Sequence, residues 1–335
     1  MGTKIYDLVE KHEITLADLQ HKVIAIDTFL FLYQFLATIR QPDGRLLTDS
    51  KGNVTSHLIG LLSRSTNFMS QGLKLAFVFD GEPPQLKRAT REQRREAKRK
   101  AQDLLETAMQ TGDEEAMRKY AARTSVLSGD MIDDAKELIS ALGMPVVQAP
   151  GEGEAQAAYL VKKGDAYAVG SNDADSLLFG ALRIVKNLGV TARRRKAGTL
   201  ASERVPLELI DLQKTLHSLE LSQDQLIYLA ILVGTDYNPG GIKGIGPKKA
   251  LGLIKKYKDV DALFSAVKWD FPCSWKEVFD TIKNAKVTDD YSLVWKQVDK
   301  KRVFTLLCDK HDFKQENVEK TLSVIRPQTT LGGFV

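Results

Sequence analysis

Acidic residues stand in five short motifs that are well separated along the sequence. They are Asp27, Asp80, Glu152, Glu154, Asp173, Asp175 and Asp236. Two motifs hold a pair of acids spaced i, i+2. Side chains at this spacing do not face each other on a helix, so these pairs have no evident structural use. Glu152 and Glu154 follow Pro150-Gly151, and the alternative for them is that they stabilise the start of a helix through its dipole.

So many carboxylates gathered at one site would repel one another, and no lysine stands inside their motifs. We therefore expect divalent cations, because ligands that are all oxygen suit Mg²⁺ or Mn²⁺ rather than zinc. Two such ions about 3.5–4 Å apart can polarise a phosphodiester, generate the attacking hydroxide and stabilise the leaving oxygen. The two cysteines and five histidines are scattered and give no zinc pattern.

Basic residues form separate clusters, although the net charge is only +5. Residues 87–100 contain eight Lys or Arg and two Glu, and residues 193–196 and 300–302 are shorter basic runs. Separated basic clusters on a globular chain favour a polyanionic partner. The alternative is a set of solvated helix faces. Divalent cations at the acids would allow an acidic site to accept a nucleic acid.

A glycine-rich turn lies at residues 244–250, Gly-Ile-Gly-Pro-Lys-Lys-Ala. It lacks the third glycine of a dinucleotide fingerprint, and Pro247 stands where a phosphate-binding loop needs lysine. We interpret it as a helix-hairpin-helix type of turn in which Pro247 opens the next helix and free N–H groups meet a DNA phosphate. Lys248 and Lys249 add positive charge. The alternative is a plain tight turn.

Three short apolar runs, at residues 23–26, 75–79 and 167–170, are predicted to be buried strands, and each leads into an acid. Long helical stretches separate them, which predicts an α/β fold with a mostly parallel sheet. Ligands of such sheets bind outside the carboxyl ends of the strands. Asp27, Asp80 and Asp173 are therefore expected to converge, although a single Asp at such a place is usually a helix cap.

The remaining segments are predicted to be mainly helical. Residues 84–124 should form one or two helices that stand off the core and break near Gly112-Asp113, because their apolar positions are sparse. Residues 226–233 should form a buried helix that ends near Gly234, with further helices to about Lys320. Residues 326–335, rich in Pro and Gly, are expected to form a free tail.

Composition limits the class of protein. The 335 residues are 43% hydrophobic with a mean hydropathy of −0.22, which excludes a disordered chain. No run approaches the ~18 apolar residues of a membrane span, so no membrane association is expected. The first residues lack the apolar segment of a secretion signal, and Cys273 and Cys308 give no disulfide framework. We expect a protein that is not secreted.

The motifs together resemble one known family. Val-Ile-Ala-Ile-Asp27, Val-Phe-Asp80-Gly-Glu, Pro-Gly-Glu152-Gly-Glu154, Asn-Asp173-Ala-Asp175 and Gly-Thr-Asp236-Tyr occur in the order and spacing typical of the flap endonuclease family of structure-specific 5′ nucleases. The resemblance covers essentially the whole chain and is to the archaeal type.

The resemblance implies a PIN-like nuclease domain with a mostly parallel central sheet, a helical arch and a helix–two-turn–helix motif. It divides the chain into an N-terminal nuclease region, the arch, an internal nuclease region with the helix–two-turn–helix, a C-terminal helical region and a tail. Their expected ranges are 1–98, 99–125, 126–258, 259–325 and 326–335.

The resemblance also implies roles for individual residues. Asp27, Asp80, Glu152 and Glu154 would serve one Mg²⁺, and Asp173, Asp175 and Asp236 a second, with Mn²⁺ as a substitute. Lys87 and Arg94 would steer the scissile phosphate, and the arch would admit the 5′ flap. The implied DNA-contacting residues are Gly2, Tyr33, Arg40, Arg64, Glu152, Gly234, Asp236, Lys248 and Lys249. Without the resemblance, Tyr33 would be assigned to the core, and Arg40 and Arg64 to the surface.

Two further sites follow from the resemblance. Backbone carbonyls near Gly241, Ile242 and Ile245 would bind K⁺, and residues 46–57 match the region that opens the junction and holds a one-nucleotide 3′ flap. The tail resembles a sliding-clamp-binding motif formed by Gln328, Leu331, Phe334 and Val335. The family usually ends this motif in two aromatics, so Val335 is a departure that would weaken clamp binding.

The implied activity is 5′-flap endonuclease and 5′-3′ exonuclease cleavage that leaves a 5′-phosphate and a 3′-hydroxyl. Its expected place is Okazaki-fragment maturation and long-patch base excision repair, by a monomer in the nucleoid-containing cytoplasm of an archaeon or in a eukaryotic nucleus. The alternatives are a paralogue specific for gaps or bubbles, and a non-catalytic scaffold that binds DNA and the clamp.

Overall fold

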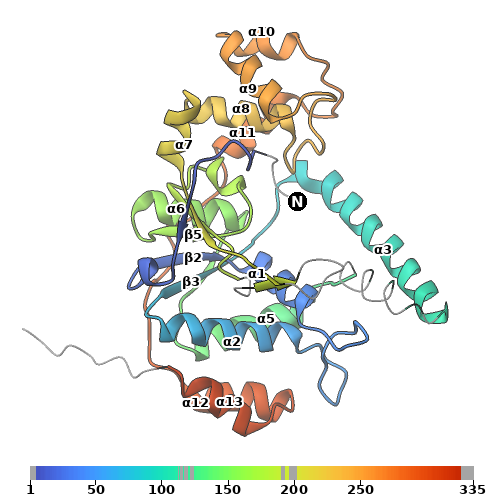
Figure 1. The fold of residues 1–335 in the computed structure, drawn as a ribbon, viewed down its shortest axis with the longest axis vertical. Coiled ribbons are helices and arrows are strands. Elements are labelled where there is room, and N and C mark those ends of the chain that lie inside the picture. The colour runs from blue at the N-terminus through green and yellow to red at the C-terminus, as the bar shows by residue number, and fades with distance from the viewer. Residues whose placement is uncertain are drawn as a thin grey trace, which may run out of the picture.

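The computed structural model of the chain describes residues 5–111, 113, 116, 120, 124–189, 193–195 and 202–325. A seven-stranded sheet forms its centre, in the order β1-β9-β6-β5-β2-β3-β4 (Figure 1). The strands are β1 (Lys11–Ile14), β2 (Val23–Asp27), β3 (Lys74–Phe79), β4 (Val146–Gln148), β5 (Ala168–Gly170), β6 (Arg183–Lys186) and β9 (Leu207–Asp211). A separate two-stranded ribbon joins β7 (Arg193–Arg195) and β8 (Ser202–Arg204).

The central strands of the sheet are parallel. Strand β2 pairs in parallel with β3 on one side and with β5 on the other, and Ile26 lies opposite both Phe77 and Gly170. Strands β4 and β6 extend the parallel part, whereas β9 and β1 are antiparallel additions at one edge. These pairings confirm the three predicted strands and the predicted mostly parallel α/β sheet.

Alternate residues of the strands feed two hydrophobic cores, one on each face of the sheet. Ile24 and Ile26 of β2 pack in one core, and Ala25 between them packs in the other. Helices α1 (Thr28–Thr38), α2 (Ser56–Ser70) and α5 (Gly129–Ala141) contribute to the first core. Helices α6 (Gly153–Lys163), α7 (Leu212–Leu219) and α8 (Gln223–Val233) contribute to the second.

Helix α3 (Arg88–Thr111) stands away from this body, as its sparse apolar positions predict (Figure 1). A short 3-10 helix, η2 (Gln85–Lys87), leads into it. Helix α3 ends at Thr111, next to the predicted break, and runs without interruption through residues 98 and 99.

The helices after the sheet lie at two opposite ends of the molecule (Figure 1). Helix α8 begins in a capping box formed by Ser222 and Gln225, and ends at Gly234 as predicted. Helix α9 (Pro247–Lys256) begins at Pro247, also as predicted, and α10 (Val260–Ser265) and α11 (Trp275–Lys283) lie at the same end. At the other end lie α12 (Lys300–Phe304), the π-helix η4 (Thr305–Lys310) and α13 (Gln315–Leu322).

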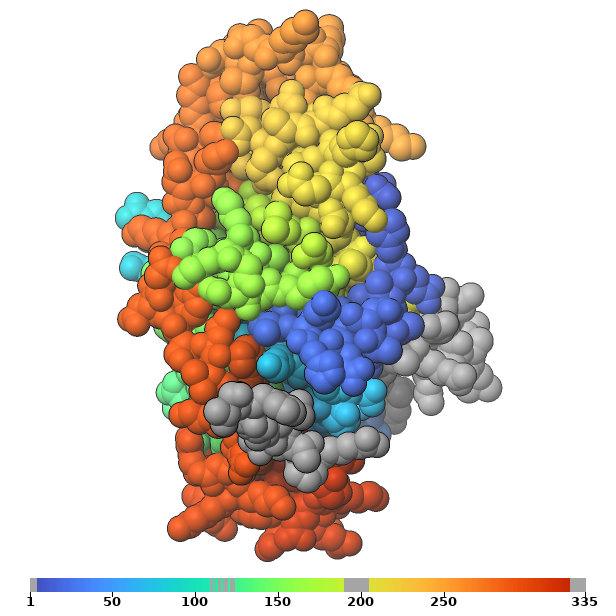
Figure 2. Space-filling view, turned by 90° about the vertical axis from the view of Figure 1, so that its left-hand side faces the viewer, coloured from blue at the N-terminus to red at the C-terminus, as the bar shows by residue number. Residues whose placement is uncertain are grey.

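Helices follow α8 as far as Leu322, as expected, but residues 285–299 between α11 and α12 form neither helix nor strand. Figure 2 shows this segment, in orange, running down one side of the molecule between the two helical ends. The backbone of Thr288 exchanges hydrogen bonds of 2.8 and 2.9 Å with the side chain of Gln156, and Trp295 Nε1 donates to the carbonyl of Leu75 at 2.9 Å. These tertiary hydrogen bonds replace the intrahelical ones. None of the described helices is long and apolar enough to cross a membrane.

Candidate active site

The carboxyl ends of the central strands place three acids at one edge of the sheet. Asp27 is the last residue of β2, Asp80 directly follows β3, and Asp173 lies in the turn after β5. Because β2 lies between β3 and β5, the three side chains gather as predicted, and Asp27 interacts electrostatically with both Asp80 and Asp173.

The start of helix α6 brings two further acids to this edge. Glu152 is the N-cap residue of α6 and Glu154 lies in its first turn. The N–H group of Gly153 donates to Asp80 Oδ1 at 2.5 Å, which joins the helix to the end of β3. A Cβ atom at Gly153 would lie 2.6 Å from that oxygen, so the close approach requires glycine at this position.

Helix capping explains one of the acids but not Glu152. Asp27 caps α1, because its Oδ1 accepts a hydrogen bond of 3.1 Å from the backbone N–H of Leu30. Glu152 makes no such bond to the backbone of α6, although it is the N-cap residue. Its two oxygens are directed instead to other side chains of the pocket, Lys87 and Tyr237.

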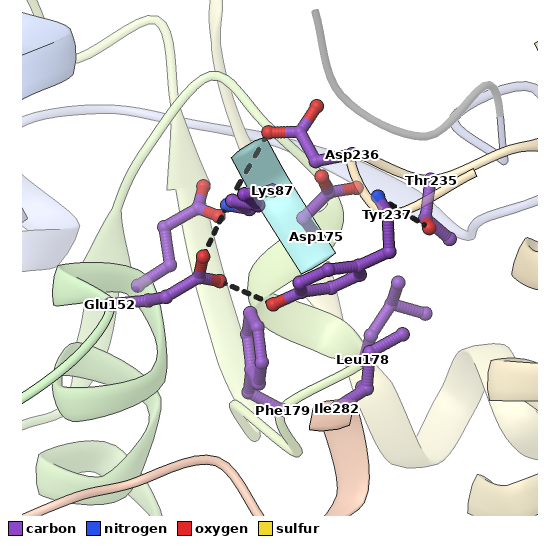
Figure 3. A pocket seen from close by; sticks show the side chains of 10 residues that line it. Lys87, Glu152, Asp175, Leu178, Phe179, Thr235, Asp236, Tyr237 and Ile282 are labelled. Atoms are coloured by element: carbon purple, nitrogen blue, oxygen red, sulfur yellow. Dashed lines mark hydrogen bonds and ion pairs between the residues drawn. The ribbon is translucent and has the colours of Figure 1, made fainter. Parts of the chain in front are cut away.

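The remaining acids come from two loops. Asp175, the first residue of the 3-10 helix η3 (Asp175–Leu177), donates its backbone N–H to Asp173 Oδ1 at 3.3 Å. Asp236 follows helix α8, and its charge raises the pKa of Asp173 in addition to the effect of burial. All seven predicted carboxylates therefore belong to one electrostatic cluster, drawn in part in Figure 3.

Burial, and after it mutual repulsion, raises the pKa values of the carboxylates in the cluster. Burial, Asp80 and Asp173 raise the pKa of Asp27 to about 7. Burial and three neighbouring carboxylates raise the pKa of Glu154 well above its ordinary value. An all-oxygen donor set rich in carboxylates fits hard divalent cations. Within the described part of the chain, however, no three of the His, Cys, Asp or Glu side chains converge on one ion position.

No lysine stands inside the acidic motifs, but Lys87, which the resemblance assigned to the scissile phosphate, compensates part of this charge. Its Nζ lies 2.5 Å from Glu152 Oε1 and 3.4 Å from Asp236 Oδ2. Burial alone would lower the pKa of Lys87, but Glu152, Glu154 and Asp236 outweigh it and raise that pKa. Lys87 is the last residue of η2, which lies in the chain between β3 and α3.

Arg94, from the first turns of α3, is the second cation of the site. Its Nη2 lies 2.5 Å from Asp236 Oδ1. Thr90, one turn earlier, donates its hydroxyl to the backbone carbonyl of Asp236. The first turns of α3 are thereby attached to the loop that follows α8.

Tyr237 is a site residue that the sequence analysis did not identify. Its hydroxyl donates to Glu152 Oε2 at 2.7 Å, and its side chain lies in the pocket beside Lys87 (Figure 3). Burial and the nearby charge of Glu152 raise the pKa of Tyr237, so the hydroxyl remains a hydrogen-bond donor. The one sequence signal was its position next to Asp236.

Three residues that the resemblance assigned to DNA binding lie outside this cluster. Tyr33 is 37% exposed on α1 rather than in the core, and Lys98 Nζ lies 4.7 Å from its ring centroid. Arg40 is half-buried and donates to the carbonyl of Gly44 at 2.8 Å and to Ser125 Oγ at 2.5 Å. Burial lowers the pKa of Arg40 and that of Arg64, which lies half-buried on α2.

The glycines between α8 and α9 allow two turns to pack backbone against backbone. Gly234 has a φ of +114°, and a Cβ atom there would lie 2.5 Å from the nitrogen of Gly241. The fully buried side chain of Asn238 stabilises these turns. It accepts a hydrogen bond of 3.1 Å from the N–H of Thr235 and donates one of 2.7 Å to the carbonyl of Ile231.

The residues predicted for K⁺ and for duplex binding surround these turns. The N–H of Ile245 donates to the carbonyl of Ile242 at 3.0 Å, and Ile242 is buried. Lys248 and Lys249 are exposed in the first turn of α9. Gly2 and the tail residues Gln328, Leu331, Phe334 and Val335 lie outside the described residues.

The raised pKa values predict a pH-dependent stability. The folded-state pKa of Asp27, about 7, exceeds its ordinary value of 3.8. Its contribution to the free energy of unfolding is therefore fully present below pH ~4 and is lost as the pH rises through about 7. Urea unfolding in EDTA should show this loss, and Mg²⁺ should restore stability at pH 8 by binding the folded state. Asp27→Asn, which keeps a capping side chain, should reduce the pH dependence of the free energy of unfolding. If that dependence is unchanged in the variant, the titration of Asp27 does not cause it.

Two family models match the regions that form this site. The XPG N-terminal domain matches residues 3–101, and the XPG I-region matches residues 143–236. Together these regions contain all seven carboxylates, Lys87 and Arg94. The fold is thus that of the XPG class of nucleases, and the matched regions contain the candidate site.

The chain is similar over nearly its whole length to archaeal proteins. It is 48% identical over 332 residues to flap endonuclease 1 of Pyrococcus abyssi, covering 99% of this chain and 96% of that protein. It is 45% identical over 330 residues to flap endonuclease 1 of Hyperthermus butylicus, covering 97% and 94%. The solved structure of flap endonuclease-1 from Methanococcus jannaschii has a TM-score of 0.76 at 41% identity and covers 97% of this chain and 98% of that one.

The chain belongs to the flap endonuclease 1 family. Both the predicted family and the predicted PIN-like nuclease fold are confirmed. The protein is a structure-specific nuclease that hydrolyses phosphodiester bonds at 5′ flaps, and the family implies roles in DNA replication and repair. Nucleases of this family depend on divalent metal ions.

Proposed function

We propose that the seven carboxylates hold two Mg²⁺ ions and that Lys87 and Arg94 contact the scissile phosphate of a 5′-flap substrate. The observation that carries this proposal is the convergence of Asp27, Asp80 and Asp173 at one sheet edge, with pKa values raised by burial and by their neighbours. Such a cluster gains most from divalent cations, because each cation relieves several repulsions at once.

The family resemblance divides the ligands into two groups. Asp27, Asp80, Glu152 and Glu154 serve one cation, and Asp173, Asp175 and Asp236 serve the other. When bound, the cations would polarise the phosphodiester, activate the attacking water and stabilise the leaving oxygen, with Mn²⁺ able to substitute for Mg²⁺.

The chain's own cations orient the phosphate. Lys87 Nζ and Arg94 Nη2 both lie beside Asp236, so a phosphate next to that carboxylate would be within reach of both. Because Lys87 is largely buried, its charge acts in a medium where little water screens it. Their effect is therefore expected on the developing charge of the transition state more than on affinity.

The DNA passes Tyr33, Arg40 and Arg64, which lie outside the carboxylate cluster. Exposed Tyr33 stacks on a base near the scissile phosphate, and Arg40, Arg64, Gly234 and Gly2 contact the substrate.

The arch at residues 99–125 admits the 5′ flap, and residues 46–57 hold the 3′ flap. A K⁺ ion binds the carbonyls near Gly241, Ile242 and Ile245. We also propose that the chain divides into five functional regions, with boundaries after residues 98, 125, 258 and 325. Helix α3 is continuous across the first of these boundaries.

The turn before α9 should bind the backbone of duplex DNA. Changing Lys248 and Lys249 together to alanine is expected to weaken binding of all duplex substrates similarly, because backbone contacts carry no sequence information. The slope of log K against log salt should fall by about 1.8, since each phosphate contact contributes ~0.9. Fluorescence anisotropy between 50 and 200 mM salt would measure it. Loss confined to flap-bearing substrates would place the turn at the junction instead.

The tail at residues 326–335 binds the cognate sliding clamp. Deleting residues 328–335 is expected to leave intrinsic flap cleavage unchanged and to remove stimulation by the clamp. Phe334→Ala alone should cost about 2 kcal/mol or more of clamp affinity, as a buried aromatic anchor does, and Val335→Phe should tighten binding. Calorimetric titration of the clamp would test this, and equal affinity of intact and truncated protein would exclude the tail as the binding segment.

The enzyme works as a monomer in the nucleoid-containing cytoplasm and leaves a nick ready for ligation. One cleavage panel tests the function directly, with double-flap, single-flap, nicked and bubble substrates in Mg²⁺ and in EDTA. The expected order has the double flap fastest, with no cleavage in EDTA. A bubble cut faster than any flap would favour the paralogue specific for gaps or bubbles.

A further inference from the structure

Tyr237 contacts two side chains of the proposed mechanism, Glu152 and Lys87. Its hydroxyl donates to Glu152 Oε2 at 2.7 Å, while Lys87 Nζ lies 2.5 Å from the other oxygen of the same carboxylate. Lys87 Nζ also lies 5.4 Å from the centroid of the tyrosine ring, within the range of a cation–π contact. Figure 3 shows the carboxylate between the two side chains.

The hydroxyl fixes the rotation of the Glu152 carboxylate. With one oxygen on Lys87 and the other on Tyr237, the carboxylate plane has a single orientation. Leu178, Phe179 and Ile282 line the adjoining wall of the pocket, and their apolar side chains offer no hydrogen bond. Loss of the hydroxyl would leave Glu152 held through one oxygen and free to turn.

The backbone of Tyr237 is anchored in the glycine turns between α8 and α9. Its N–H donates to Thr235 Oγ1 at 3.1 Å, and that hydroxyl donates to Asn238 Oδ1 at 2.7 Å. Asn238 is fully buried and is bonded in turn to the carbonyl of Ile231 at the end of α8. The ring is only 7% exposed, so it has little freedom to move independently of these turns.

We propose that Tyr237 is a positioning residue for flap cleavage. It holds Glu152 and Lys87 in fixed positions relative to each other and connects both to the turns that precede α9. This proposal rests on the proposed function, in which Glu152 helps to hold a cation and Lys87 contacts the scissile phosphate. The side chain of Tyr237 would thus connect the turns proposed to bind duplex DNA with the carboxylate cluster.

The test compares Tyr237→Phe with Tyr228→Phe. Tyr228 lies on α8 and stacks on Phe279 with ring centroids 4.7 Å apart, so the control also removes a hydroxyl, but from an aromatic cluster outside the site. Three quantities are measured: flap affinity by anisotropy in EDTA, the single-turnover cleavage rate at saturating enzyme, and Mn²⁺ binding to the DNA-free protein by electron paramagnetic resonance.

Tyr237→Phe should lower the single-turnover rate and the Mn²⁺ affinity by roughly 10- to 100-fold, the usual cost of losing a partner of a metal-binding carboxylate. Flap affinity should stay within about 2-fold, because the hydroxyl does not face the DNA-binding lysines. Tyr237→Leu, which also removes the ring from beside Lys87, should lower the rate further. Tyr228→Phe should match the wild-type protein in all three measurements.

Two results would overturn the proposal, and they can be told apart. If Tyr237→Phe melts at a lower temperature but keeps the wild-type saturating rate and Mn²⁺ affinity, Tyr237 is only a structural residue, and the cation proposal stands. If the wild-type protein binds no Mn²⁺ and Glu152→Gln cleaves at the wild-type rate, the proposed function fails and this inference fails with it.

Discussion

Asp80→Ala and Asp173→Ala are each expected to abolish flap cleavage, by on the order of 10³-fold or more, while the protein still binds its substrate. Each change removes one carboxylate from a cluster whose members raise the pKa values of one another. The remaining acids would hold the proposed cations less tightly and in a different position. Because the cluster repels phosphate, flap affinity should stay constant or increase.

Single-turnover cleavage in Mg²⁺ and flap binding in EDTA would measure the two effects separately. Asp270→Ala is a matched control, since Asp270 is an exposed acid in the segment between α10 and α11, paired with Lys268. The control should cleave and bind as the wild-type protein does. Cleavage at near wild-type rate by both active-site variants would refute the assignment of the carboxylates to two cations.

Lys87→Ala and Arg94→Ala are expected to slow the cleavage of bound substrate by about 10²-fold and to weaken binding much less. Many other cations share the contacts to the DNA backbone, but few can reach the charge that develops at one phosphate. Lys87 is expected to have the larger effect, because its side chain is 17% exposed whereas that of Arg94 is 45% exposed.

Arg95→Ala provides the control for the arch base. It removes the same charge from the neighbouring position on α3, where the side chain is exposed to solvent. The single-turnover rate and the dissociation constant should be compared for the three variants. If Lys87→Ala changes only the affinity, and by no more than Arg95→Ala does, then Lys87 is an ordinary phosphate contact.

The sequence predicted the central sheet and its acids because local patterns determine both. Each of β2, β3 and β5 is a short apolar run, and the parallel arrangement brings its carboxyl end to a common edge. The start of α9 was also local information, since Pro247 can occupy the first turn of a helix but not its interior. These elements needed no knowledge of distant contacts.

Features that depend on tertiary contacts were not predicted. The contact of Lys87 with Glu152 joins residues 65 positions apart, and the hydrogen bond of Tyr237 with Glu152 joins residues 85 positions apart. Neither pair has a pattern that periodicity or spacing could reveal. Residues 285–299 lie between two of the expected helices but form none, and their backbone bonds go to Gln156, Gly143 and Ala141 on other elements. Long-range partners outweighed local propensity there.

Anomalous scattering from Mn²⁺ in crystals of the protein with flap DNA would locate the proposed cations. Two manganese peaks are expected about 3.5–4 Å apart at the carboxyl edge of the sheet. One peak should lie within ligand distance of Asp80 and Glu154, and the other within ligand distance of Asp173. A single peak there, or peaks that none of the seven carboxylates contacts, would contradict the proposed two-cation site.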